Sequence, residues 1–74
     1  MTHATRKNVG QRVRALREES NLTQEQLAER VGISRQHMGA IEAPNLCRPI
    51  SLDLLFNIAT VLDIEPAKLL TFRE

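Results

Sequence analysis

The sequence is poor in cysteine and in aromatic residues, and it contains no long apolar run. One cysteine among 74 residues excludes an internal disulfide framework and fits a reducing, cytoplasmic setting. No stretch approaches the ~18 apolar residues of a transmembrane helix, so we expect no membrane partner. Two aromatics, Phe56 and Phe72, are too few for the stacking platforms of single-stranded nucleic-acid binders. A chain of this length predicts one domain, 1–74, with a thin core.

The residue patterns of catalytic and metal-binding sites are also lacking. The sequence has no paired carboxylates, no nucleophile beside a base and no glycine-rich phosphate loop, so we expect no enzyme. His3, His37 and Cys47 have no partners at ligand spacing. We therefore expect neither a metal site nor a cofactor.

Charge is unevenly distributed, although the net charge is only +1. Residues 1–48 carry eight Lys and Arg against five Glu, a net charge of +3. Residues 49–74 carry two basic against four acidic residues, a net charge of −2. A basic half opposite an acidic half fits a nucleic-acid face. It fits scattered surface charge equally well, so charge alone does not decide.

Apolar residues recur at helical spacing, which predicts an all-α fold of five short helices. The first helix is expected from about Asn8 to Ser20, with Asn8 and Gln11 forming a capping box. The next two are expected over 24–31, after a Thr23–Gln26 capping box, and over 35–42, after the N-cap Ser34. Ser51 should cap the fourth helix, with Leu52, Leu55, Ile58, Ala59 and Leu62 facing inward. Pro66 should open a short fifth helix with Leu69 and Leu70 as its apolar face.

Residues 24–43 have the pattern of two short helices joined by a sharp turn. Ala28 is small enough for a steep crossing of the two helices, and Gly32 can adopt the positive φ that the turn needs. The inward positions are apolar: Leu27, Val31, Ile33, Met38 and Ile41. The outward positions of the second helix are Arg35, Gln36, His37, Gly39 and Ala40. Such a helix can enter the major groove of DNA with its N-terminal residues at base edges.

These features resemble the helix-turn-helix regulators of the phage repressor and Cro class, also called the xenobiotic-response-element class. The resemblance is carried by residues 12–17 (RVRALR), 22–28 (LTQEQLA), 31–34 (VGIS), 38–42 (MGAIE) and 62–70 (LDIEPAKLL). These motifs occur in the family's order and spacing from about Val9 to Leu70. The resemblance implies a compact bundle of five helices, with the helix over 35–42 as the recognition helix in the major groove.

The resemblance also implies roles for individual residues. Base contacts are implied for Arg35, Gln36, His37, Gly39 and Ala40, although an exposed residue without a DNA contact fits His37 equally well. Phosphate contacts are implied for Thr23, Gln24, Ser34, Asn45 and Arg48. Arg17 and Glu42 match a structural ion pair that bridges the first and third helices. Arginine suits guanine and glutamine suits adenine, each bidentate contact giving about 1–3 kcal/mol of discrimination.

Two small residues depart from the family pattern within the recognition helix. Ala40 stands where many relatives carry a polar base-reading residue. Gly39 costs up to about 1 kcal/mol of helix stability relative to alanine. Their small size would let the DNA approach the helix closely.

The fourth and fifth helices are more apolar than one buried face requires. A homodimer surface is therefore expected from Leu54, Phe56, Val61, Leu69 and Phe72. Completion of a small core by the same residues remains an alternative.

Two classes of function follow from the sequence. The first is a sequence-specific regulator of transcription that binds double-stranded DNA as a homodimer, with half-sites of an inverted repeat about 34 Å apart. The second is a protein-interaction module, such as an antitoxin or a coactivator-like adaptor, with a protein partner. The polar outward face of 35–42 favours DNA.

Overall fold

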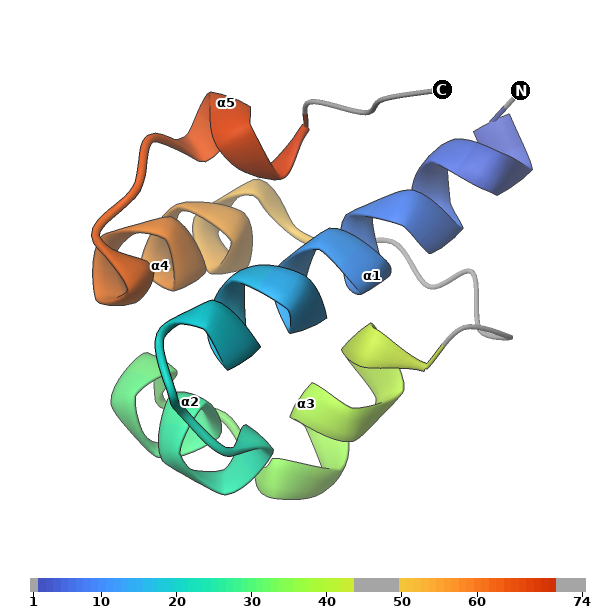
Figure 1. Cartoon of the computed structure of the whole chain (residues 1–74). Helices are drawn as coiled ribbons and strands as arrows, with labels where there is room; N and C mark the ends of the chain where they lie inside the picture. Colours follow the sequence, from blue (N-terminus) through green and yellow to red (C-terminus); the bar gives the residue numbers. More distant parts are fainter. Residues whose placement is uncertain (1, 44–49, 71–74) are drawn as a thin grey trace.

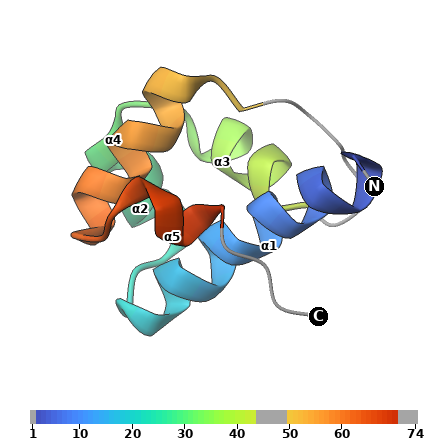
Figure 2. The ribbon, with the colours of Figure 1, turned by 90° about the horizontal axis from the view of Figure 1, so that it is seen from above.

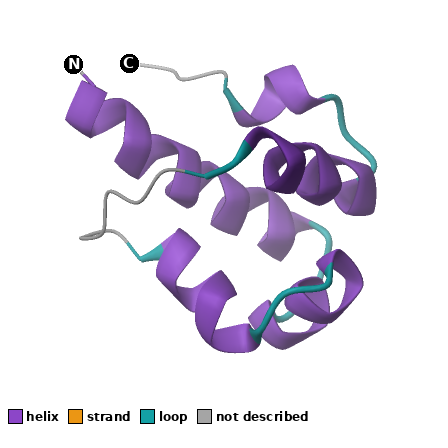
Figure 3. Ribbon diagram, turned by 180° about the vertical axis from the view of Figure 1, so that it is seen from behind, coloured by secondary structure: helices purple, strands orange, loops and turns teal. Residues whose placement is uncertain are grey.

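The computed structural model describes residues 2–43 and 50–70, with side chains from Val9 onwards. Within these ranges the chain forms five helices and no strand (Figures 1 and 3). They are α1 (Thr2–Glu19), α2 (Gln24–Val31), α3 (Arg35–Glu42), α4 (Leu52–Leu62) and α5 (Pro66–Leu69). The predicted all-α fold of five helices is confirmed.

The helices are arranged around α1. In the view of Figure 1, α1 runs diagonally across the molecule, with α4 and α5 above it and α2 and α3 below it. It contacts α3, α4 and α5, while α2 packs against α3 and α4 (Figure 2). The pair formed by α2 and α3 therefore lies at one end of the molecule, supported by α1 and α4.

Capping residues set the boundaries of three helices as the sequence predicts. The Thr23 hydroxyl accepts a hydrogen bond from the Gln26 backbone N–H, and the Gln26 carboxamide oxygen accepts one from the Thr23 N–H. The Ser34 hydroxyl accepts from the N–H of His37 at the start of α3. Ser51 caps α4 through the N–H of Leu54. Each cap satisfies a backbone donor that the helix itself leaves unpaired.

The first helix begins earlier than predicted, at Thr2 instead of about Asn8. No glycine or proline interrupts residues 2–9, so the helix continues in the N-terminal direction through the expected cap. Asn8 lies inside α1, and the predicted capping box with Gln11 is wrong. The Gln11 carboxamide instead donates to the backbone carbonyl of Glu42 at 3.1 Å, which joins α1 to the end of α3.

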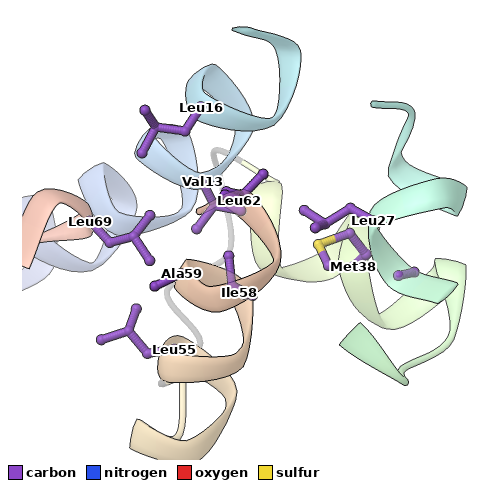
Figure 4. Packing of buried hydrophobic residues seen from close by; sticks show 10 residues of the cluster. Val13, Leu16, Leu27, Met38, Leu55, Ile58, Ala59, Leu62 and Leu69 are labelled. Atoms are coloured by element: carbon purple, nitrogen blue, oxygen red, sulfur yellow. The ribbon is translucent and has the colours of Figure 1, made fainter. Parts of the chain in front are cut away.

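One apolar core lies where the five helices meet (Figure 4). Every helix contributes to it, from Val13 of α1 to Leu69 of α5. The buried apolar residues are Val13, Leu16, Leu27, Ala28, Met38, Ile41, Leu55, Ile58, Ala59, Leu62 and Leu69. Burial of this set is the main stabilising contribution, at about 25 cal/mol for each Å² removed from water.

The structure corrects the predictions for three apolar side chains. Leu69, expected on a dimer surface, is fully buried, because α5 turns this side chain toward the core. Leu52, expected to face inward, is 63% exposed in the first turn of α4. Leu70, predicted on the apolar face of the fifth helix together with Leu69, is 51% exposed and lies just after the last residue of α5.

A close crossing of α1 and α3 depends on Gly10, which the sequence analysis did not single out. A Cβ atom added to Gly10 would overlap the carbonyl oxygen of Ile41. The backbones of the two helices therefore approach more closely than any other residue at this position would permit. This contact fixes the C-terminal end of α3 against α1.

Candidate nucleic-acid interface

The bend between α2 and α3 has the geometry that the sequence predicts. Gly32 has φ 92°, and its N–H donates to the carbonyl of Ala28 at 2.8 Å. The N–H of Ile33 donates to the same carbonyl at 3.0 Å. Ala28, 1% exposed, lies in the core cluster beside Leu27 and Met38. These contacts hold the two helices at a fixed crossing, which sets the direction in which α3 faces outward.

The outer face of α3 is polar. Arg35, Gln36 and His37 are exposed, while Gly39 and Ala40 are half-buried. Met38 and Ile41 point inward from the same helix. Gln36 and His37 line a shallow hollow together with Ser34 and Ala40. The five residues predicted as base contacts therefore come from the side of α3 that the core does not use.

Unpaired backbone N–H groups lie at the first turns of both α2 and α3. Among the described residues, the N–H groups of Gln24 and Glu25 and those of Arg35 and Gln36 take part in no hydrogen bond. Such donors, together with the helix dipole, attract anions. The Thr23 and Ser34 hydroxyls accept cap bonds and can still donate their proton to an acceptor. These groups could bind the phosphates of a DNA backbone.

A buried ion pair lies behind this surface. Arg17 of α1 holds the carboxylate of Glu42 with two hydrogen bonds, from Nε to Oε2 at 2.7 Å and from a terminal nitrogen to Oε1 at 3.0 Å. A third bond runs from the guanidinium to the carbonyl of Leu22 at 2.7 Å. The hydrogen bond to Glu42 raises the pKa of Arg17 above its ordinary value, although burial acts in the opposite direction. The structural pair expected from the sequence is present, and it joins α1, α3 and the segment before α2.

The side chain of Gln24, predicted to contact a phosphate, also makes a hydrogen bond within the protein. Its side chain is half-buried, and its Nε2 donates to Oε1 of Glu42 at 3.1 Å. A Cβ added at Gly39 would lie 3.7 Å from the Gln24 Oε1 atom, so this carboxamide passes directly beside Gly39. Gln24, expected to contact DNA, is thus hydrogen-bonded to Glu42, expected to have a structural role.

Three of the predicted site residues cannot be placed. Asn45 and Arg48, predicted phosphate contacts, and Phe72, a predicted dimer residue, lie outside the described residues.

Within the described ranges, no three His, Cys, Asp or Glu side chains are grouped as a metal site. None of the helices described has the length and apolar character needed to span a bilayer.

Large apolar side chains are also exposed on α4 and at the residue that follows α5. Leu52, Phe56 and Leu70 are the large apolar side chains most exposed to solvent in the described chain, at 63%, 46% and 51%. Leu54 and Val61 are half-buried and pack against the core. Of the predicted dimer residues, Phe56 is therefore well exposed, and Leu54 and Val61 partly so.

The five-helix fold and this bend define a helix-turn-helix protein, and a model of the helix-turn-helix family matches residues 13–69. The chain belongs to this family of DNA-binding transcriptional regulators, and the family predicted from the sequence is confirmed. It is similar to control protein C.SmaI of Serratia marcescens, with 38% identity over 63 residues, covering 85% of this chain and 73% of that protein. It is also similar to the crystal structure of the restriction-modification controller protein C.AhdI from Aeromonas hydrophila. That comparison has a TM-score of 0.81 and 41% identity, and it covers 89% of this chain and 97% of that chain.

Proposed function

We propose that the chain is a sequence-specific regulator that binds an inverted repeat in double-stranded DNA as a homodimer. The observation that carries the proposal is the exposed Arg35–Gln36–His37 surface at the N-terminal end of α3, next to the bend at Gly32. In this family such a helix docks in the major groove, which is wide enough to admit it.

The proposed contacts divide into two kinds. Arg35 and Gln36 read base edges, with His37, Gly39 and Ala40 beside them on the same helix. Thr23, Gln24 and Ser34, at the starts of α2 and α3, hold the phosphate backbone, together with Asn45 and Arg48, which follow α3 in the sequence. Phosphate contacts fix the register of the protein on the duplex, and base contacts supply the sequence preference.

The proposed homodimer uses the exposed apolar residues of α4 and the residue that follows α5. Leu52, Phe56 and Leu70 support it, because they expose large apolar area on a domain with a small core. A two-fold dimer presents two copies of α3 to half-sites about 34 Å apart. The operator would then be a short inverted repeat.

The names of the relatives suggest the biological setting. One is called a control protein and the other a restriction-modification controller protein. We propose that this chain likewise controls genes of a restriction-modification system. The likeness to two regulatory proteins also supports a function other than catalysis.

The proposal is tested by selecting bound sites from a pool of random duplexes. The expected result is an inverted repeat bound with nanomolar affinity that weakens steeply as salt rises, because phosphate contacts release counterions. A single asymmetric site would contradict the homodimer, and no enrichment of any sequence would contradict specific DNA binding.

Two substitutions test the division of roles. Gln36→Ala should cost about 1–3 kcal/mol on the selected operator and relax preference at one base step, since it removes a base contact. Gln24→Ala should weaken operator and random DNA alike, because it removes a phosphate contact, and should leave the salt dependence unchanged, because the glutamine amide carries no charge. Equal losses on both kinds of DNA for both variants would contradict the assignment. Titrations of labelled duplexes at several salt concentrations provide the measurement.

A further inference from the structure

We propose that Glu42 is a positioning residue for DNA binding, because it sets the orientation of the Gln24 carboxamide at the start of α2. This role rests on the proposed function and goes beyond the structural part that the Arg17–Glu42 pair plays. It makes a buried carboxylate part of the machinery that holds a phosphate.

The orientation follows from hydrogen-bond chemistry. An ionised carboxylate only accepts hydrogen bonds, so Glu42 attracts the amide nitrogen of Gln24 and repels its carbonyl oxygen. The distance of 3.1 Å between Gln24 Nε2 and Glu42 Oε1 fits this arrangement. A phosphate oxygen is likewise only an acceptor. The Gln24 side chain can therefore serve a phosphate only through an N–H of its amide nitrogen.

The amide nitrogen of Gln24 has two N–H groups, and one of them donates its hydrogen bond to Glu42. The second N–H has no acceptor among the described residues. It belongs to a half-buried side chain at the same helix start as the unpaired backbone N–H groups of Gln24 and Glu25. Glu42 thus leaves one side-chain donor and two backbone donors together at the start of α2, where an anion is favoured.

The surroundings of Glu42 keep this arrangement fixed. Its side chain is 2% exposed, and Arg17 bonds both carboxylate oxygens. The guanidinium also neutralises the carboxylate, so the buried group adds no net negative charge beside the DNA. Gly39 has no side chain, and the Gln24 carboxamide passes beside it on the way to Glu42.

Coupled substitutions on the full chain test this role. Gln24→Ala should lower affinity for the selected operator about tenfold in the wild-type background but only about twofold in a Glu42→Gln background, a coupling of about fivefold. Gln36→Ala is the matched control, because its exposed side chain makes no hydrogen bond within the described residues, and its penalty should be the same in both backgrounds. All affinities are measured at a temperature where circular dichroism shows each variant to be folded.

The outcomes separate this role from the proposed function. If the wild type binds no duplex, the proposed function fails. If the wild type binds but Gln24→Ala costs the same factor in both backgrounds, only the positioning role is overturned. A purely structural Glu42 would change the Gln24 and Gln36 penalties equally.

A measurement on the wild type serves if Glu42→Gln does not fold. The side-chain NH₂ signals of Gln24 should exchange with solvent several-fold more slowly than those of Gln36 in NMR spectra of the free protein. Addition of operator should then shift the Gln24 NH₂ signals. Exchange as fast as that of Gln36, or signals that operator leaves unchanged, would overturn the proposal.

Discussion

At the scale of single residues, the most consequential contacts are those of Glu42. A buried carboxylate is costly to desolvate, and it is tolerated here because Arg17 and Gln24 supply three hydrogen bonds to its oxygens. The raised pKa of Arg17 means that its charged form is favoured in the folded chain. The stabilisation that the Arg17 charge provides is therefore fully present below the ordinary pKa of arginine and is lost as pH rises through the raised pKa.

Removal of Arg17 should unfold the protein. Arg17→Ala leaves a buried charge without its partner, a loss of about 3–5 kcal/mol, and a domain of this size has only about 3–5 kcal/mol in total. Arg14→Ala is the matched control on the same helix, because Arg14 and Glu18 form an exposed pair worth about 0.3–0.5 kcal/mol. Urea titrations followed by circular dichroism compare them. Similar midpoints for the two variants would contradict this account.

The substitution Gly39→Ala should have the opposite effect. An added Cβ would meet only the Gln24 Oε1 atom, at 3.7 Å, an ordinary contact. The gain in helix propensity is about 0.5–1 kcal/mol, which corresponds to a rise in Tm of about 2–8 °C. Thermal melts check this, with Gly32→Ala as the contrast, since the positive φ of 92° should make that variant less stable. A lower Tm for Gly39→Ala would show that the space beside Gln24 is needed.

At the scale of helices, local signals in the sequence predicted most boundaries. The caps at Thr23, Ser34 and Ser51 were predictable because each forms its hydrogen bond with a residue only three positions further along the chain. The bend at Gly32 was predictable for the same reason. The start of α1 was not, because an asparagine at Asn8 resembles a cap whether or not the preceding residues are helical. The sides taken by Leu52 and Leu69 depend on how α4 and α5 meet the other helices, and local spacing does not contain that information.

For the candidate site, the exposed positions were predictable from the sequence, but the long-range hydrogen bonds were not. The outward positions of α3 follow from helical spacing once Met38 and Ile41 are placed inward. The bond between Gln24 and Glu42 joins residues 18 positions apart, and the bond from Gln11 to the Glu42 carbonyl joins residues 31 apart. No short-range pattern predicts either bond.

The substitution Gly10→Ala should disturb the packing of α1 against α3. The new methyl group would overlap the backbone carbonyl of Ile41, so the helices must separate, at a cost of about 1–3 kcal/mol. Because α3 carries the proposed base contacts, operator affinity should fall as well, even where the variant is folded. Chemical denaturation and DNA titration are the two measurements. Unchanged stability would contradict the close approach of the two backbones.

At the scale of the whole molecule, the two ends have different surfaces. One end carries the polar face of α3, and the exposed apolar side chains of Leu52, Phe56 and Leu70 lie on α4 and just after α5. The residues proposed for the dimer and those proposed to contact bases thus come from different helices.

The substitution Phe56→Asp tests the proposed dimer. A charge on the exposed apolar surface should produce a folded monomer in sedimentation experiments, since Phe56 is 46% exposed and outside the core cluster. Affinity for the full inverted repeat should fall about 100-fold or more, because the second half-site no longer adds to binding. Affinity for an isolated half-site should remain unchanged. A variant that still sediments as a dimer would place the interface elsewhere.

The central position of α1 bears on how the protein is made. The Nε atom of Arg12 in α1 donates to the carbonyl of Lys68 in α5 at 3.2 Å, across 56 positions of sequence. During translation α1 emerges from the ribosome before α3, α4 and α5, the helices that it contacts. The core therefore stays incomplete until Leu69 of α5 has been synthesised, and we expect a nascent copy to bind DNA only after that point.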